Sequence, residues 1–248
     1  MTPKLSIVIP NYNEKENLQA GALTQVSAYL KKVPYTWEVI ISDDGSTDGS
    51  RDLAEAFVKK HGGFRLLKNA HGGKASAVNA GIKAAKGEII LFTDMDQSTP
   101  LKEVERLLPY YGQGYDVVFG SRGTTRKNFP PMRQITSWGF RTLRQLFLLA
   151  HVADTQCGFK SFKASVAKEI FPKLSVLRER AVGWTVSAFD VELLFLAEKS
   201  GYKLKEVEVE WSQQDLSTGK ENKMVKESID MLKQILNVKI NDLKGLYR

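Results

Sequence analysis

The sequence predicts an α/β fold in which a mostly parallel sheet is flanked by helices. Two observations lead to this prediction. Short runs rich in Val, Ile, Leu and Phe alternate with helical patterns over the first 120 residues or so, as in parallel sheets covered on both faces. Polar and glycine-rich segments follow these runs, as expected where ligands bind outside the carboxyl ends of strands. The predicted strands are Leu5–Ile9, Glu38–Ser42, Phe64–Leu67, Glu88–Thr93 and Asp116–Gly120.

The second half of the chain differs in composition. From Val117 to Ala153 it holds six Arg or Lys and no Asp or Glu, and Arg133–Ala150 within it predicts a basic amphipathic helix. Two further strands are predicted at Phe159–Phe162 and Lys203–Trp211, and a helix is predicted between them at Phe189–Lys199. Apolar residues at steps of three or four predict a long, Lys-rich amphipathic helix at the C-terminus. Its stripe consists of Val225, Ile229, Leu232, Leu236, Ile240, Leu243 and Tyr247.

Composition limits the classes of function. A chain of 248 residues that is 42% hydrophobic can build one large α/β domain. Its net charge of +8 favours an anionic partner such as nucleic acid, a phosphorylated small molecule or an acidic membrane surface. Cys157 is the only cysteine and the three histidines lack zinc-ligand spacing, which favours a reducing compartment. No run of about 18 apolar residues occurs, so no membrane span is expected.

Several nucleotide and metal motifs are absent or poor. The first strand is followed by PNYNEKEN rather than GxGxxG, which argues against a dinucleotide fold. The segment around HGGKAS resembles a P-loop only in part, because Lys68, five residues before Gly73, stands where that motif needs Gly, and Ala75 stands where it needs Ser or Thr. DMDQSTPLKEVE has Thr99 in place of the glycine of a calcium-binding EF-hand loop. None of these three classes fits.

The run IILFTDMDQSTP ends a buried strand with two carboxylates one residue apart, Asp94 and Asp96. Side chains two apart in a strand point the same way, so the pair can converge on Mg²⁺ or Mn²⁺ together with substrate phosphates. Met95 then serves as a spacer facing the other way. The alternative is a solvated loop in which an Asp, Ser98 or Thr99 only caps the helix predicted near Pro100.

Two neighbouring segments support a donor site. Asp43 and Asp44 at the end of the second strand can accept hydrogen bonds from a ribose or from the N–H of a base, although DDGSTDG also forms a turn. Lys74 stands at the start of a helix, where it and the helix N–H groups can meet phosphate oxygens. A solvated lysine is the alternative there.

Seven blocks in order carry a family resemblance: PNYNE, DDGSTDGS, HGGKASAVNAG, DMD, GSR, DTQCGFKSF and FDVELL. They resemble family 2 glycosyltransferases of the GT-A fold, a Rossmann-like fold, and within them the branch that makes polyprenyl-phosphate sugars, dolichyl-phosphate β-glucosyltransferases above all. The resemblance covers about Leu5 to Trp211. It implies a GT-A domain over 1–211, with a nucleotide-sugar half (1–120) and an acceptor half (121–211). A phosphate-covering loop and the amphipathic helix follow over 212–248.

The resemblance also implies site residues. Asp96 would be the main metal ligand beside Asp94, and Asp190, Asp96 and Arg122 would take part in catalysis. The nucleotide-sugar set is Pro10, Tyr12, Glu14, Asp43, Asp44, Lys74, Asp94, Met95, Asp96, Gln97, Arg122 and Lys223, with Lys220 as the substitute for Lys223. The acceptor set is Arg122, Arg126, Arg133, Asp154, Gln156 and Lys160.

The implied function is metal-assisted, inverting transfer of a hexose from a nucleotide sugar to a polyprenyl (dolichyl) phosphate. UDP-glucose is favoured as the donor, and GDP-mannose is the alternative donor. A sugar in place of the lipid phosphate is the alternative acceptor. Many relatives carry a membrane span that is not found here. The expected location is therefore peripheral, on the cytoplasmic face of a membrane, held by the basic stretch and terminal helix or by a separate anchoring subunit. Packing of that helix on the domain is the alternative.

Other classes fit less well. A nucleic-acid-binding protein would agree with the charge of +8, but the basic residues are not interleaved with a reading motif and the acidic blocks lie on the expected ligand edge. A nucleotidyltransferase would carry a glycine-rich basic loop after the first strand. A processive polysaccharide synthase would have a QxxRW-like motif after Trp211, which is missing.

Overall fold

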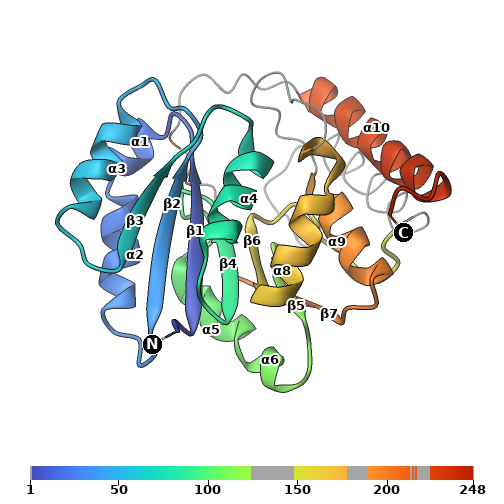
Figure 1. Cartoon of the computed structure of the whole chain (residues 1–248), viewed down its shortest axis with the longest axis horizontal. Coiled ribbons are helices and arrows are strands. Elements are labelled where there is room, and N and C mark those ends of the chain that lie inside the picture. The colour runs from blue at the N-terminus through green and yellow to red at the C-terminus, as the bar shows by residue number, and fades with distance from the viewer. Residues whose placement is uncertain are drawn as a thin grey trace.

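The computed structural model describes residues 2–123, 148–177, 189–212, 214, 216 and 224–247. Seven strands form one sheet in the order β3-β2-β1-β4-β6-β5-β7 (Figure 1). All neighbours pair in parallel except β6, which runs antiparallel to both β4 and β5. The strands are β1 (Leu5–Asn11), β2 (Trp37–Asp43), β3 (Phe64–Lys68), β4 (Ile89–Thr93), β5 (Val117–Ser121), β6 (Phe159–Lys163) and β7 (Leu204–Glu208). The predicted mostly parallel α/β sheet is confirmed.

Helices cover both faces of the sheet, and each face has its own hydrophobic core. One core packs α4 (Lys74–Ala84), α8 (Ala164–Ile170) and α9 (Phe189–Lys199) on the sheet, and these helices lie in front of it in Figure 1. The other core packs α2 (Ala22–Leu30), α3 (Ser50–Val58) and α5 (Val104–Leu107) on the opposite face. The central strands are buried on both faces, which explains why their sequences are continuous apolar runs rather than alternating ones.

Shorter elements complete the fold. They are α1 (Lys15–Gln19), α6 (Pro109–Gly112) and the 3₁₀ turns η1 (Leu101–Glu103), η2 (Phe171–Lys173) and η3 (Ser175–Leu177). Most of the basic helix predicted at Arg133–Ala150 lies outside the described residues, and its last three positions, 148 to 150, are not helical.

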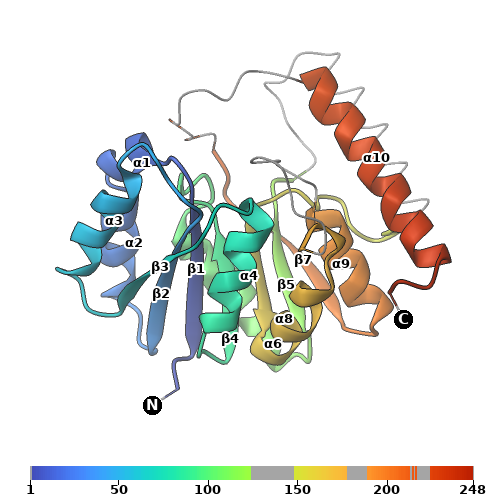
Figure 2. The same cartoon turned by 45° about the horizontal axis from the view of Figure 1, so that its top comes forward.

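The terminal helix is present as α10 (Met224–Leu243), beside α9 on the β7 side of the molecule (Figure 2). Its buried apolar side chains are Ile235 and Val238. Of the predicted stripe, Leu236, Ile240 and Leu243 are 51%, 44% and 76% exposed, whereas Tyr247, beyond the helix, packs against the core. The side chains of Val225, Ile229 and Leu232 lie outside the described part of the structure. At 100° per residue the buried and exposed groups lie on different sides of the helix. Within the described residues, no helix is long and apolar enough to cross a membrane.

Candidate active site

The loops that hold the predicted site residues meet at one edge of the sheet. This edge carries the carboxyl ends of the parallel strands, including those of β1, β2, β4 and β5. Because β6 is antiparallel and pairs Phe159 with Thr93 at the end of β4, its first residue lies at the same edge. The DTQCG segment before β6 is thereby placed beside the DMD segment after β4.

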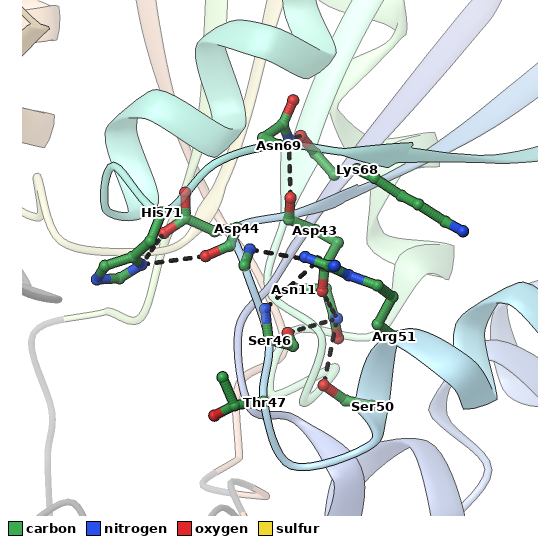
Figure 3. Close-up of polar contacts among 12 residues, drawn as sticks. Asn11, Asp43, Asp44, Ser46, Thr47, Ser50, Arg51, Lys68, Asn69 and His71 are labelled. Atoms are coloured by element: carbon green, nitrogen blue, oxygen red, sulfur yellow. Dashed lines mark hydrogen bonds and ion pairs between the residues drawn. The ribbon is translucent and has the colours of Figure 1, made fainter.

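The ends of β1 and β2 are joined by a buried polar cluster around Asp43 (Figure 3). The Asp43 carboxylate accepts hydrogen bonds from Asn11 Nδ2 at 2.7 Å and Arg51 Nε at 2.6 Å. It also accepts the backbone N–H groups of Gly45 and Ser46. With its side chain fully buried, Asp43 holds the loop together, as the alternative interpretation of DDGSTDG as a turn anticipates.

Asp44 points toward the loop after β3 (Figure 3). Its two carboxylate oxygens accept the N–H groups of Gly72 and Gly73, both at 2.9 Å, and one lies 2.8 Å from His71 Nδ1. Burial acts to raise the pKa of Asp44 above its usual value, although these hydrogen bonds oppose the rise. The His71 ring stacks on Tyr12 with centroids 4.5 Å apart. An acid, an imidazole and a phenol from three loops thus adjoin one another.

Asn13 links the loops that follow β1 and β2. Asn13 adopts a φ of 54° and its side-chain oxygen accepts the Thr47 N–H, so it ties the β1 loop to the β2 loop. Glu14, another predicted nucleoside residue, precedes α1 and accepts Asn17 Nδ2 at 2.6 Å. Pro10 is buried within β1. The predicted nucleoside residues therefore lie in or beside two interlocked loops.

Asp94 and Lys74 form an ion pair at the centre of the edge. Lys74 Nζ lies 2.5 Å from Asp94 Oδ1, and the Lys74 side chain is only 18% exposed, so the solvated-lysine alternative is not observed. Burial acts to lower the pKa of Lys74, but the nearby carboxylates of Asp94 and Asp190 raise it above its ordinary value. The ammonium group is therefore a fixed positive charge at the start of α4.

The next three residues turn sharply. Met95 is buried in the core on the α2 and α5 side, which agrees with its predicted role as a spacer. Asp96 Oδ1 accepts the Ser98 N–H at 2.9 Å. Gln97 is buried with a φ of 52° and donates its amide N–H to the Asp94 carbonyl oxygen at 2.8 Å. A positive φ in a residue other than glycine is a strained conformation that often occurs at functional loops.

The two carboxylates suit a divalent cation. No set of three acidic, His or Cys side chains with metal-binding geometry occurs among the described residues. Mg²⁺ and Mn²⁺, however, are commonly held by one or two carboxylates, with water and substrate phosphates as the other ligands. The Asp94 side chain is 36% exposed, so an ion can reach it. Asp94 and Asp96 therefore fit an ion that is shared with a diphosphate.

Arg122, directly after β5, is held by a chain of carboxylates. Asp154 accepts Arg122 Nε at 2.7 Å and Nη2 at 2.8 Å as a bidentate pair, together with the backbone N–H groups of Arg122 and Gln156. Glu206 on β7 accepts the N–H of Asp154 at 2.8 Å. Burial acts to raise the pKa of Asp154, but the bonds with Arg122 hold it well below its usual range.

Further contacts surround this arginine. The Trp211 ring centroid lies 5.7 Å from the Arg122 guanidinium carbon. Beyond Trp211 the backbone crosses to the loop after β4, residues 94–98, which would hold the ion and is called the metal loop below. There Ser212 donates its N–H to the Ser98 carbonyl oxygen at 2.9 Å. Leu216 donates its N–H to Asn17 Oδ1 on α1. The segment that leads toward Lys223 is thus attached to the Asp96 loop.

Lys160 and Asp190 form a second ion pair. Lys160 Nζ donates to Asp190 Oδ1 at 2.7 Å and to the carbonyl oxygen of Cys157. The Lys160 side chain is fully buried, whereas that of Asp190 is 15% exposed. Lys160 thus reaches Asp190 from beneath and is not exposed to an acceptor as its place in the predicted acceptor set suggests. Arg126, Arg133, Lys220 and Lys223 lie outside the described residues.

Three important neighbours have no strong signal in the sequence. Glu206 is far in the chain from Asp154, which it holds, and only the sheet order brings the two together. Arg51 is eight residues from Asp43, but the pattern does not show that its side chain turns back to that carboxylate. Gly158 gives space to the metal loop, because a Cβ there would lie 2.0 Å from Asp94 Oδ2. Its place in DTQCGF next to a strand was a possible signal, since glycine often marks close approach of another group.

Comparisons with known proteins show the family of this chain. Residues 6–171 match the sequence model of glycosyl transferase family 2. The chain is 32% identical to a dolichyl-phosphate β-glucosyltransferase of Dictyostelium discoideum, over 98% of this chain and 76% of that protein. It is also 32% identical to the Homo sapiens protein of that name, over 100% of this chain and 78% of that protein.

Solved structures share the fold at low identity. The mannosyltransferase PcManGT from Pyrobaculum calidifontis, in complex with GDP-Man and Mn²⁺, aligns with a TM-score of 0.61 at 16% identity, over 96% of this chain and 65% of that chain. Glucosyl-3-phosphoglycerate synthase from Mycobacterium tuberculosis, in a complex with Mn²⁺ and UDP, aligns with a TM-score of 0.62 at 19% identity, over 95% of this chain and 78% of that one. The chain is a glycosyltransferase with the GT-A fold, and it belongs to glycosyl transferase family 2.

Proposed function

We propose that the protein transfers glucose from UDP-glucose to dolichyl phosphate, with inversion at the anomeric carbon. The observation that carries the proposal is the identity of 32% with two dolichyl-phosphate β-glucosyltransferases over nearly the whole chain. The geometry supports it, since a carboxylate pair, a lysine and a fixed arginine lie at one edge of the sheet.

The donor would lie across the loops after β1, β2, β3 and β4. Tyr12, His71 and Asp44 offer stacking surfaces and a carboxylate for the nucleoside. Lys74 at the start of α4, with the helix N–H groups, would receive phosphate oxygens. Lys223, outside the described residues, would cover the phosphates.

Asp94 and Asp96 would hold Mg²⁺ or Mn²⁺ together with the donor diphosphate. When bound, such an ion stabilises the negative charge that develops on the leaving diphosphate. Lys74 would stabilise the same negative charge, because its ammonium group is already held in place by Asp94 before the reaction begins.

The acceptor would approach Arg122 and Asp190. A phosphate monoester has a second pKa of about 6, so it arrives mostly ionised and can attack the anomeric carbon without a general base. Arg122 suits this anion because its guanidinium is permanently charged and its plane is fixed by Asp154. Asp190 would then orient neighbouring groups rather than remove a proton.

A lipid acceptor also requires a membrane surface, and we propose that the protein binds one peripherally, on its cytoplasmic face. The exposed side of α10 supports this, because Leu236, Ile240 and Leu243 project from a helix whose other side is buried against the domain. Lys233 on α10 and Lys244 directly after it are exposed, and basic residues of this kind are common in helices that bind anionic interfaces.

The proposed reaction is tested with a panel of donors. The protein is incubated with Mn²⁺, dolichyl phosphate and either UDP-glucose or GDP-mannose carrying a labelled sugar, and the lipid is then extracted. We expect label in the lipid only with UDP-glucose. Label from GDP-mannose alone would overturn the donor, and transfer of glucose to a sugar but not to the lipid would overturn the acceptor.

A further inference from the structure

A buried ammonium group lies beneath the acidic residue at the start of α9. Lys160 is in the middle of the sheet, on β6, where its register neighbours are Phe92 on β4 and Phe119 on β5. Its side chain is fully buried, and its Nζ lies 5.4 Å from the centroid of the Phe92 ring. A lysine at such a position is unusual, because burying a charge is costly unless the charge is paired.

The pairing is provided by Asp190 and by one backbone carbonyl. Lys160 Nζ donates to Asp190 Oδ1 at 2.7 Å and to the carbonyl oxygen of Cys157. Asp190 is the second residue of α9, and its side chain is 15% exposed. The Cys157 carbonyl that shares the ammonium group belongs to the segment before β6, which starts opposite the end of β4. The buried ammonium group therefore fixes the height and direction of this carboxylate.

The Asp190 carboxylate also acts on two cations of the site. Burial acts to lower the pKa of Lys74, and the charges of Asp94 and Asp190 raise it. Burial likewise acts to lower the pKa of Arg122, and the paired Asp154, with a smaller contribution from Asp190, raises it. Asp190 thus lies within electrostatic reach of the lysine on the donor side and of the arginine on the acceptor side.

We propose that Lys160 is a positioning residue, which holds the Asp190 carboxylate at the edge of the sheet where the donor and acceptor loops meet. Held there, the negative charge acts on both cations, on Lys74, which would face the donor phosphate, and on Arg122, which would face the acceptor phosphate. The assignment of the two phosphates rests on the proposed function. The position of the carboxylate itself rests on the ion pair.

The proposal predicts that Lys160 acts through Asp190, which a double-mutant cycle measures. Lys160→Met, Asp190→Asn and the double variant are compared for glucose transfer to dolichyl phosphate. We expect each single change to lower kcat/KM by about tenfold, and the double change to lower it no further, since small misplacements of site groups cost up to about 10²-fold. Lys160→Arg, which keeps the cation, should recover part of the lost activity.

Two controls separate positioning from a general loss of structure. Lys163→Met changes the other lysine of β6, which is half-exposed and paired with Asp116 at 2.8 Å away from the site edge, and it should leave kcat/KM unchanged. Melting temperatures of all variants show whether the fold persists. Multiplicative effects of the two single changes on kcat/KM would overturn the proposal, as would a lack of any effect from Lys160→Met in a folded protein.

A second measurement does not depend on the acceptor or on turnover. The same four proteins are titrated calorimetrically with UDP in the presence of Mn²⁺. We expect Lys160→Met to weaken UDP binding in the wild-type background and to have no effect in the Asp190→Asn background. If the effects of Lys160→Met and Asp190→Asn on UDP binding are coupled but the wild type does not glucosylate the lipid, only the proposed function is contradicted. If the wild type is active but the two effects are not coupled, the role of Lys160 is contradicted.

Discussion

Gly158 determines how closely the β6 loop can approach the metal loop. A Cβ at this position would lie 2.0 Å from Asp94 Oδ2 and 2.7 Å from its carboxyl carbon, whereas real Cβ contacts are not shorter than about 3 Å. Asp94 in turn pairs with Lys74. A single hydrogen atom in place of a side chain therefore allows the carboxylate, the lysine and the β6 loop to occupy their positions together.

A methyl group at Gly158 should displace the Asp94 carboxylate and weaken donor binding. We expect Gly158→Ala to lower kcat/KM for UDP-glucose by about 10²-fold, as for a shift of about 1 Å in a site group. Gly112→Ala is the control, because nothing lies within 4 Å of a Cβ there. The measurement is steady-state kinetics with the donor varied. Equal activity of both variants would show that Asp94 is not confined as the structure indicates.

Asp96 and Asp190 should differ in importance, although both are acidic residues of the site. Asp96→Ala removes the main expected metal ligand, and we expect a loss in kcat of at least about 10³-fold. Asp190→Asn should cost only about tenfold, since a general base is typically worth about 10²- to 10⁴-fold and an ionised phosphate acceptor requires none. The measurement is the kcat of each variant at saturating acceptor. An equally complete loss in both variants would contradict a base-free reaction.

Some site residues could be predicted from sequence and others could not. The pair Asp94 and Asp96 could be picked out from the sequence, because a strand and the carboxylates at its end are adjacent in the chain. The alternative that DDGSTDG forms a turn was right for Asp43, whose carboxylate is consumed by Arg51 and Asn11. A long-range partner such as Asn11 depends on which strands are neighbours, and local pattern carries no such information.

At the scale of elements, three segments converge on Arg122. It follows β5, Asp154 belongs to the loop before β6, and Glu206 lies on β7. Glu206 accepts the N–H groups of Ala153 and Asp154 and so fixes the loop whose carboxylate holds the arginine. Because Asp154 and Arg122 are 6% and 16% exposed, removal of one partner leaves the other charge buried.

Asp154→Asn should destabilise the protein in a pH-dependent manner. The folded-state pKa of Asp154 lies below its unfolded value, which is about 4. The ionised carboxylate therefore stabilises the fold above pH 4, and this stabilisation is lost as pH falls through the lower folded-state pKa. We expect a cost of about 3 kcal/mol at pH 7, shrinking below pH 4. Urea unfolding from pH 7 to pH 3 measures it, and a difference that grows toward low pH would contradict the assignment.

One side of the terminal helix packs on the domain and another side is exposed. Tyr247, just beyond α10, donates its hydroxyl to Glu192 on α9 at 2.6 Å, and Lys199 on α9 pairs with Asp242. The helix and its approximate length were predictable from its spacing of apolar residues. The side that packs was not, because α10 carries apolar residues on more than one side and only the position of α9 selects Ile235 and Val238.

The exposed side of α10 should contribute to membrane binding. Replacing both Ile240 and Leu243 with Ser should weaken binding to anionic liposomes by about 2 to 4 kcal/mol, given about 1.5 to 3 kcal/mol for full burial of one such side chain. Leu53→Ser, on α3 with 37% exposure, is the control. Flotation with vesicles measures the bound fraction. Unchanged flotation of the double variant would exclude this side of α10 as an anchor.

At the scale of the whole molecule, the sheet gathers distant segments at one edge. The sequence pattern predicts the parallel strands well, since strands buried on both faces must be continuously apolar. It does not predict that β6 is inserted antiparallel between β4 and β5, because strand order depends on contacts between segments far apart in the chain. That insertion places Gly158 and Lys160 beside the DMD loop.

The most direct test is the transfer of labelled glucose from UDP-glucose into dolichyl phosphate, measured with Mn²⁺, after chelation with EDTA and after Mn²⁺ is restored, for the wild type and Asp96→Ala. We expect lipid-extractable label for the wild type with Mn²⁺, its loss with EDTA, its return with Mn²⁺, and almost none for Asp96→Ala. Glucosyl lipid formed equally with EDTA and by the Asp96→Ala variant would contradict a metal-assisted donor site at this edge of the sheet.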